Sequence, residues 1–343
     1  MNEEEKAFLT RVQVGRASPN YSNEGINPRR VSQGSSLLFR RTFNRFRLLF
    51  TFIICRKGTA DSAAWRRTKQ CLSLLINEFL IQDILAMNST HETLTAAYRK
   101  TLSELPLHWF DRSRAHEPEF AKLSGLFIPG TSESYEQAPK RIMVVGRETR
   151  QWNVVTDKKP FLNLDEYIQR AMTKQQAHLA KYLPEPPDKG SSYFNLLRSL
   201  ASEHGYGGIA WANLFGFAWN GKSPMRWPNL PILLDISERL LKSQIQILKP
   251  DTIIFANGAT SAKFRRKYFP HTGEQSVCTN LADFREQGIG IDQLWRFHLN
   301  GTIQCYRIQH PSSISTASRE ARRFLLDHVL RKDPTEGDVP GSA

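Results

Sequence analysis

Four short apolar segments alternate with longer segments that have helical spacing, and this alternation is what most restricts the fold. The apolar segments are Arg141–Gly146, Gly208–Leu214, Thr252–Gly258 and Gln304–Gln309. Between and after them, apolar residues recur every three or four positions over Leu162–Tyr182, Tyr193–His204, Ile232–Leu248 and Ser318–Arg331. Continuous apolar strands that alternate with helices are typical of a parallel sheet covered on both faces. The sequence therefore predicts an α/β fold of this kind.

The charge of the chain points to an anionic partner. Lys and Arg together number 47 against 33 Asp and Glu, which gives a formal net charge of +14 over 343 residues. Such an excess favours a polyanion, nucleic acid first and an anionic membrane surface second. The longest apolar run, Leu48–Cys55, ends at Arg56 and is far shorter than the roughly 20 residues that cross a bilayer. We therefore expect DNA or RNA as a partner and no membrane.

The first 86 residues differ in composition from the rest. They hold 14 basic and 7 acidic residues, and no acidic residue occurs between Ile26 and Ala60. Three interpretations remain open: a basic arm that contacts DNA, an amphipathic transit-like segment, or an upstream extension of the reading frame. The third places the start of the working protein at Met87, and a chain that begins there is expected to fold.

Residues 87–332 are expected to form the folded domain. A capping box at Ser89-Thr90-His91-Glu92 predicts the start of a helix. The apolar residues that share one side of this helix are Leu94, Tyr98, Leu102 and Leu105. Residues 333–343 are rich in Pro and Gly, and we expect a disordered tail there.

The cysteines give no sign of a metal centre. They stand at positions 55, 71, 278 and 305 and form no C-x-x-C pair. We expect reduced thiols, no metal and no cofactor. The acidic opening MNEEEK does not resemble a secretory signal, so a cytoplasmic protein is expected.

Polar residues follow each of the four predicted strands. Glu148 comes after the first strand, Asn213 ends the second, the turn Gly258-Ala259-Thr260-Ser261 follows the third, and His310 follows the fourth. Ligands of parallel sheets bind outside the carboxyl ends of the strands. A carboxylate, an amide, an imidazole and a turn that suits a phosphate are therefore expected along one edge.

The segments VGRE (residues 145–148), SYFNLLR (192–198) and HPSSIS (310–315) together resemble the uracil-DNA glycosylase superfamily. The resemblance runs from about Arg141 to Arg331. It implies a three-layer α/β/α sandwich around a four-stranded parallel sheet. It also implies a metal-independent, monofunctional DNA glycosylase that flips a pyrimidine out of DNA and leaves an abasic site, acting as a monomer.

The resemblance assigns a role to each matching position. Glu148 corresponds to the acidic residue that orients water and offsets positive charge on the sugar, and His310 to the histidine that binds the leaving base. Asn213 corresponds to the amide that reads the flipped base, and Ile314 to the apolar wedge that enters the duplex. The positions that correspond to phosphate-contacting loops are Ser192, Ser261, Pro311 and Ser312.

The chemistry of the reaction fits these residue types. Cleavage of an N-glycosidic bond makes the sugar cationic and the departing base anionic, so a carboxylate and a hydrogen-bond donor are both needed. A flipped base also needs a stacking surface, for which Trp152 is the candidate, with Phe161 behind it. The basic residues expected to contact the DNA backbone include Lys222, Arg226, Arg319, Arg322 and Arg323.

The segment after Gly146 departs from the pattern of the superfamily. Uracil-excising members have Gln, Asp, Pro, Tyr and His there, and their Tyr excludes substituents at C5 of the base. This chain has Arg147, Glu148, Thr149, Arg150 and Gln151. Arg150 stands where that Tyr would be, so a substituent at C5 is not excluded. Two kinds of base are therefore expected: uracil or a damaged pyrimidine, or else a bulky modified cytosine of phage DNA, as in the anti-phage branch of the superfamily.

Two other function classes stay open. One is a non-catalytic DNA-binding protein that senses lesions or phage DNA. The other is an N-glycosidase that acts on small nucleosides or nucleotides, which would have no use for the wedge Ile314 or for phosphate-contacting serines.

Overall fold

The computed structural model describes residues 90–110, 117–131, 134–154 and 161–331. The predicted extension 1–86, the tail 333–343 and Ser89 of the capping box lie outside the described residues. Residues 90–102 are helical, and Leu94, Tyr98 and Leu102 are fully buried as their spacing predicts.

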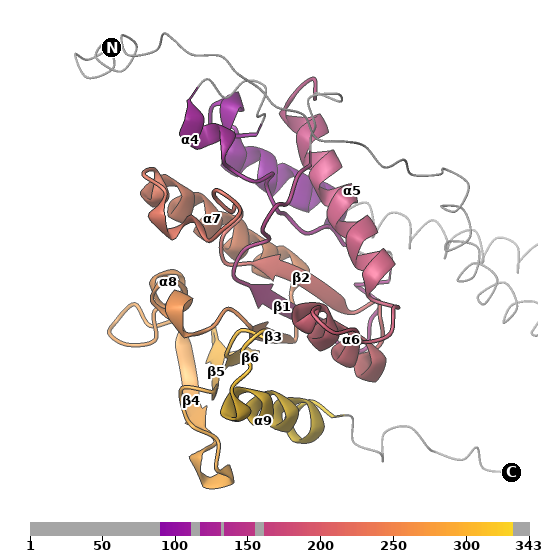
Figure 1. The fold of residues 1–343 in the computed structure, drawn as a ribbon, viewed down its shortest axis with the longest axis vertical. Helices are drawn as coiled ribbons and strands as arrows, with labels where there is room; N and C mark the ends of the chain where they lie inside the picture. The colour runs from indigo at the N-terminus through magenta and orange to yellow at the C-terminus, as the bar shows by residue number, and fades with distance from the viewer. Residues whose placement is uncertain (1–89, 111–116, 132–133, 155–160, 332–343) are drawn as a thin grey trace, which may run out of the picture. The chain divides into compact units, whose positions relative to one another are not determined.

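The chain folds as α/β around one mixed sheet of six strands (Figure 1). The strand order is β2-β1-β3-β6-β5-β4. The first four in this order are parallel to one another, and β5 and β4 are antiparallel to their neighbours. The strands are β1 Ile142–Gly146, β2 Ile209–Asn213, β3 Thr252–Phe255, β4 Cys278–Asp283, β5 Leu294–Leu299 and β6 Ile303–Ile308.

The four predicted strands correspond to β1, β2, β3 and β6, but the expectation of a four-stranded, wholly parallel sheet is wrong. The hairpin β4–β5 extends the sheet beyond β6. In β5 the charged Arg296 interrupts the apolar residues, and most of β4 is exposed or half-buried. A search for continuous apolar runs finds strands buried on both faces, so it passes over partly exposed strands at an edge.

The predicted helices are all present, with ends displaced by a few residues. The long helices are α5 Leu164–Tyr182, α6 Ser192–His204, α7 Leu230–Leu248 and α9 Thr316–Phe324, and α9 continues into a π turn over Leu325–Val329. The short α4 Pro118–Ala121 was not predicted as a helix, whereas α8 Ala262–Tyr268 begins directly after the turn Gly258–Ser261, which was expected to enter a helix. Single 3-10 turns occur at Leu107–Trp109, Pro224–Arg226, Ala259–Ser261 and Arg285–Gln287.

Side-chain hydrogen bonds fix the starts of two helices. Asn163 accepts a hydrogen bond from the backbone N–H of Glu166 (3.0 Å), and α5 begins one residue after this cap. Ser315 accepts one from the backbone N–H of Ser318 (3.3 Å), and α9 begins at Thr316. Both caps satisfy N–H groups that the first helical turn leaves without a partner.

Helices cover both faces of the sheet, which gives three layers (Figure 1). Alternate residues of each central strand point to opposite faces: Met143 and Val145 pack with α5, α7 and α8, whereas Ile142 and Val144 pack with α6 and α9. Both faces are apolar because these strands are buried on both sides. The carboxyl ends of β1, β2, β3 and β6 therefore meet at one edge between the two helical layers.

Candidate functional site at the carboxyl edge of the sheet

Backbone register brings the ends of the parallel strands together. Gly146 pairs with Asn213 across β1 and β2, and Phe255 of β3 lies beside both Val145 and Arg307. The segments that follow these strands carry Glu148 and His310. Residues that are about 160 positions apart in sequence therefore share one edge of the sheet, as the strand pattern predicts.

Gly146 is surrounded so closely that no side chain fits there. A Cβ atom added at this residue would lie 2.6 Å from the Asn213 amide and 3.1 Å from the Tyr193 hydroxyl. Tyr193 comes from the first turn of α6, and its hydroxyl donates to the carbonyl oxygen of Val144 (3.1 Å). Burial raises the pKa of Tyr193, so this phenol remains protonated at neutral pH. The missing side chain at Gly146 is what allows α6 and β2 to approach β1 here.

Asn213 is held by the loop that follows β1. Its amide contacts the hydroxyl of Thr149 at 2.6 Å, and the residue is 7% exposed. The orientation that satisfies all neighbours directs Oδ1 to Thr149 and lets Nδ2 donate to the carbonyl oxygen of Ala212 (3.0 Å). The amide is therefore fixed at the strand end.

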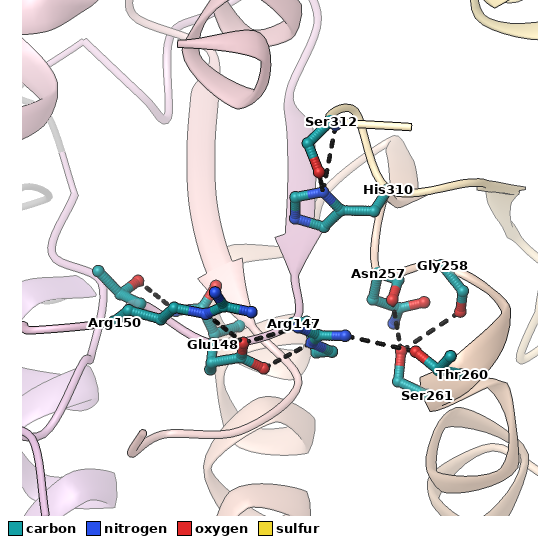
Figure 2. A network of polar contacts seen from close by, with 11 residues as sticks. Arg147, Glu148, Arg150, Asn257, Gly258, Thr260, Ser261, His310 and Ser312 are labelled. Carbon is teal, nitrogen blue, oxygen red and sulfur yellow. Dashed lines mark hydrogen bonds and ion pairs between the residues drawn. The ribbon is translucent and has the colours of Figure 1, made fainter. Parts of the chain in front are cut away.

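Glu148 lies between two arginines, as Figure 2 shows. Arg147 binds both carboxylate oxygens, with Nε to Oε2 at 2.6 Å and Nη2 to Oε1 at 3.0 Å. Arg150 adds one contact from Nε to Oε1 at 3.3 Å. The Glu148 side chain is 2% exposed, whereas that of Arg150 is 55% exposed. The carboxylate is thus neutralised and covered by its own loop.

His310 has a defined tautomer. The backbone N–H of Ser312 donates to Nδ1 (3.2 Å), and the Ser312 hydroxyl lies 2.6 Å from the same nitrogen (Figure 2). Because a backbone N–H can only donate, Nδ1 must be the unprotonated nitrogen and the ring proton is on Nε2. His310 can therefore offer Nε2–H to a ligand.

Burial and the surrounding charges favour the neutral form of His310. Burial lowers the pKa of His310, and the nearby charges of Arg147, Arg150 and Arg322 lower it further, while Glu148 acts in the opposite direction. Arg322 belongs to α9, whereas Arg147, Glu148 and Arg150 belong to the loop after β1. Glu148 is thus one of the charged groups that act on the His310 ring across this edge of the sheet.

The aromatic residues expected to stack on a base are buried in the core instead. Trp152 is 5% exposed, packs between Phe127 and Trp211, and donates its indole N–H to the carbonyl of Leu126 (3.1 Å). Phe161 is 2% exposed and belongs to the hydrophobic cluster on the opposite face of the sheet. Phe161 therefore does not stand behind Trp152, and neither ring offers a free face at the site.

The residues expected to contact DNA, which are four phosphate-contacting positions and the wedge Ile314, differ in their exposure. Ser192 is half-buried at the start of α6, and Ile314 is 79% exposed, so its side chain is accessible to a partner. Ser261 is fully buried and donates to the carbonyl oxygen of Asn257 (2.5 Å), so its hydroxyl is not directed to solvent. Pro311 is likewise buried. The Ser312 hydroxyl is at the surface but contacts His310.

Three further residues shape the site although the sequence did not single them out. Arg147 and Thr149 position Glu148 and Asn213 as described. The third is Tyr193, whose ring lies at 29° to the ring of His310 with their centroids 6.4 Å apart. Tyr193 is only partly buried, and it sits within the SYFNLLR segment that had drawn attention for Ser192. Tyr193, and not Trp152, is therefore the aromatic ring that lies beside Gly146 and His310.

The hairpin β4–β5 contributes a loop to the same edge. Because β5 runs antiparallel to β6, the segment before Leu294 lies next to the end of β6. The Arg307 guanidinium donates to the carbonyl oxygens of Ile291 and Asp292, and Gln309 Nε2 donates to that of Asp292 (2.7 Å). These bonds attach the loop to the strand that carries His310.

Two surface pockets lie away from this edge. Their volumes are about 980 and 740 Å³, and Arg141 and Lys249, at the amino ends of β1 and β3, are among the residues that line them. Neither pocket includes Glu148, Asn213 or His310. The candidate site is therefore defined by the strand ends and their side chains.

Comparisons with known proteins add no family. No protein-family model matches the chain, and a search of curated proteins finds no match either. In the described part of the chain, His, Cys, Asp and Glu do not gather in the groups of three that hold a metal ion. None of the helices in those ranges is long and apolar enough to cross a membrane.

Proposed function

We propose that the protein is a monofunctional DNA glycosylase related to the uracil-DNA glycosylase superfamily, which flips a pyrimidine out of DNA and hydrolyses its N-glycosidic bond. One observation supports this most directly. Glu148, Asn213 and His310 come from three separate segments and lie together at the carboxyl edge of one sheet. The three-layer α/β architecture agrees with the fold that the motifs imply.

In this proposal His310 stabilises the leaving base. As the bond between C1′ and the base nitrogen breaks, its electron pair goes to the base, whose oxygen gains negative charge. The neutral Nε2–H of His310 donates to that oxygen, and the Ser312 N–H keeps the ring in the required tautomer. A fixed donor of this kind typically contributes about 3 kcal/mol to lowering the barrier.

Glu148 provides the negative charge near the sugar. The carboxylate offsets the positive charge of the deoxyribose and accepts a proton from the water whose oxygen bonds to C1′. The base leaves as an anion and takes a proton from solvent. Since Arg147 and Arg150 hold this carboxylate in the free protein, binding of DNA has to loosen at least the exposed Arg150.

Tyr193 and Ile314 complete the proposed site. Tyr193 is rigid, lies beside Gly146 and is nearly parallel to His310, so it is the best candidate for a stacking surface. Ile314 is the exposed apolar side chain on the segment after His310, as expected of a wedge that fills the space of the flipped base. Arg150 stands where uracil-excising members exclude C5 substituents, so both simple and bulky pyrimidines stay as candidates.

One observation favours a second function. The Glu148 side chain is 2% exposed and is paired with two arginines, so this carboxylate is not available for catalysis in the free protein. A protein that only recognises DNA would tolerate this arrangement. A non-catalytic sensor of damaged or phage DNA is therefore the second candidate.

Release of the base from DNA tests the proposal. The protein is incubated with uracil-containing DNA and with hypermodified phage DNA, and any released base is identified by mass spectrometry. We expect Glu148→Gln to abolish release while DNA affinity stays near wild type, because the amide keeps the shape but loses the charge. We expect His310→Ala to slow release by about 10² or more, because one fixed donor is lost.

Three outcomes separate the candidates. DNA binding without release of any base supports the sensor. Undiminished turnover of Glu148→Gln removes this carboxylate from the mechanism, and a change below about threefold in His310→Ala removes the imidazole. Thermal unfolding of each variant, compared with wild type, shows whether a loss of activity reflects a loss of fold.

A further inference from the structure

The Asn213 side-chain amide has one N–H group available to a ligand, whereas its oxygen is fully used by hydrogen bonds within the protein. Its Oδ1 accepts two hydrogen bonds from Thr149, one from the backbone N–H (3.2 Å) and one from the hydroxyl (2.6 Å). An amide oxygen has two lone pairs, so both are used. One N–H of Nδ2 donates to the carbonyl oxygen of Ala212 (3.0 Å), and the other N–H remains available to a ligand. The opposite orientation would bring Oδ1 against that carbonyl oxygen and Nδ2 against the Thr149 N–H, which are two repulsive contacts.

Two other side chains at this edge of the sheet present donors as well. His310 offers Nε2–H, because Nδ1 is taken by the Ser312 N–H. Arg150 is a guanidinium and can only donate. The acceptor oxygens of Glu148 are already bound by Arg147 and Arg150. A base that enters this site therefore meets donors on the side of Asn213.

Pyrimidines differ in what they offer to such a group. N3 of cytosine is an acceptor, whereas N3 of uracil and thymine carries a hydrogen and is a donor. We propose that Thr149 is a specificity-determining residue that makes Asn213 a pure donor and so selects bases of the cytosine class over bases of the uracil class. This inference rests on the proposed function, because it takes Asn213 as the group that reads the flipped base.

The residue at position 149 explains why the amide differs here. Uracil-excising members of the superfamily have Pro at this place in the motif, and Pro has neither a backbone N–H nor a hydroxyl. The amide oxygen then lacks both of the bonds that Thr149 supplies and is free to accept from N3–H. With Thr149 in place, N3–H of a uracil would find no acceptor on Asn213, and a buried donor that lacks a partner costs about a factor of ten or more in binding.

The same donor suits the departure of a cytosine. When the glycosidic bond breaks, negative charge spreads from the ring nitrogen to the carbonyl oxygen and to N3. The hydrogen bond from the free N–H of Asn213 to N3 would strengthen as this charge develops. The hydrogen bond from Nε2–H of His310 to the carbonyl oxygen would strengthen for the same reason. Substituents at C5 lie on another side of the ring, so Asn213 does not contact them.

The test compares bases that differ only in the edge that Asn213 reads. Two matched pairs are placed at one position of a duplex: cytosine with uracil, and 5-hydroxymethylcytosine with 5-hydroxymethyluracil. Each nucleotide carries fluorine at C2′, which opposes positive charge on the sugar and slows cleavage, so affinity is measured by fluorescence anisotropy without turnover. The readout is the ratio of the two Kd values in each pair.

Three substitutions at Thr149 grade the number of donors to Oδ1. Thr149→Ser keeps both donors and is the matched control, Thr149→Val keeps only the backbone N–H, and Thr149→Pro keeps neither. We expect wild type and Thr149→Ser to prefer the cytosine member of each pair by about tenfold or more. Thr149→Val should reduce this preference, and Thr149→Pro should remove or reverse it.

Each outcome bears on one claim only. Equal affinity of wild type for both members, or an unchanged ratio in Thr149→Val and Thr149→Pro proteins that still unfold at the wild-type temperature, overturns the role of Thr149. If the ratios behave as expected but no unfluorinated DNA ever loses a base, the enzymatic proposal fails while the recognition of the cytosine edge stands. Efficient release of uracil by wild type with no preference for cytosine would leave the glycosylase and remove the inference.

Discussion

The close packing around Gly146 gives a prediction that does not depend on any substrate. In Gly146→Ala the new methyl carbon would lie 2.6 Å from the Asn213 amide and 3.1 Å from the Tyr193 hydroxyl. Carbon contacts are normally 3.5–4.0 Å. Neither neighbour can yield easily, because Thr149 and Ala212 hold the amide and Val144 holds the hydroxyl.

The expected loss of stability follows from that crowding. Extra methylenes in a packed interior typically cost about 1–3 kcal/mol in the free energy of unfolding. For a domain of this size, that corresponds to a fall in Tm of roughly 2–12 °C. Gly216→Ala is the control, because its added carbon meets the end of the Leu126 side chain at 3.1 Å and nothing else closer than 3.7 Å. Its cost should be smaller.

A double-mutant cycle shows whether Asn213 is the cause. In an Asn213→Ala background the amide is gone, so the added cost of Gly146→Ala should fall by at least about 1 kcal/mol. Scanning calorimetry of the four proteins measures the coupling. A Gly146→Ala protein that unfolds at the wild-type temperature, or an equal cost in both backgrounds, would refute the packing described for this edge.

Two further predictions concern charged groups. The rate of base release should be constant above the ordinary histidine pKa of 6.5 and should fall at lower pH, where His310 becomes protonated through its lowered pKa. Because Arg322 lowers that pKa, Arg322→Gln should move the fall in rate to higher pH, whereas the control Arg323→Gln should not. Arg265 is 3% exposed, lies over Phe255 and Phe297, and in the described structure its Nε and Nη1 have no hydrogen-bond partner. Burial lowers its pKa to about 10. Arg265→Met should therefore raise the free energy of unfolding by about 1 kcal/mol, and a loss of that size in chemical denaturation would contradict this view.

The central strands and the residues that follow them could be predicted because burial on both faces leaves a plain signal. β1, β2, β3 and β6 are continuous apolar runs, and their parallel order places Glu148 and His310 on the same edge. The hairpin β4–β5 has one exposed side and a charged residue in β5, so composition alone did not separate it from a loop.

The partners of the site residues could not be predicted, because they depend on side-chain directions. Nothing in the sequence says that Arg147 turns back onto Glu148 or that Thr149 binds Asn213. Aromatic character likewise does not reveal which ring faces the core. Trp152 and Phe161 therefore looked like candidates for a stacking surface, although they belong to separate hydrophobic clusters.

The arginines around Glu148 have a consequence for what the protein can process. Arg147 binds the carboxylate through two nitrogens, whereas Arg150 binds it through one nitrogen and has a half-exposed side chain. A phosphate oxygen that approaches Arg150 competes directly with Glu148 for it, and a nucleic acid brings such an oxygen along with the base. A free nucleoside lacks that oxygen and leaves the ion pair undisturbed, so under the proposed function it should stay unhydrolysed, whereas the backbone of the nucleic acid would release the carboxylate for the reaction.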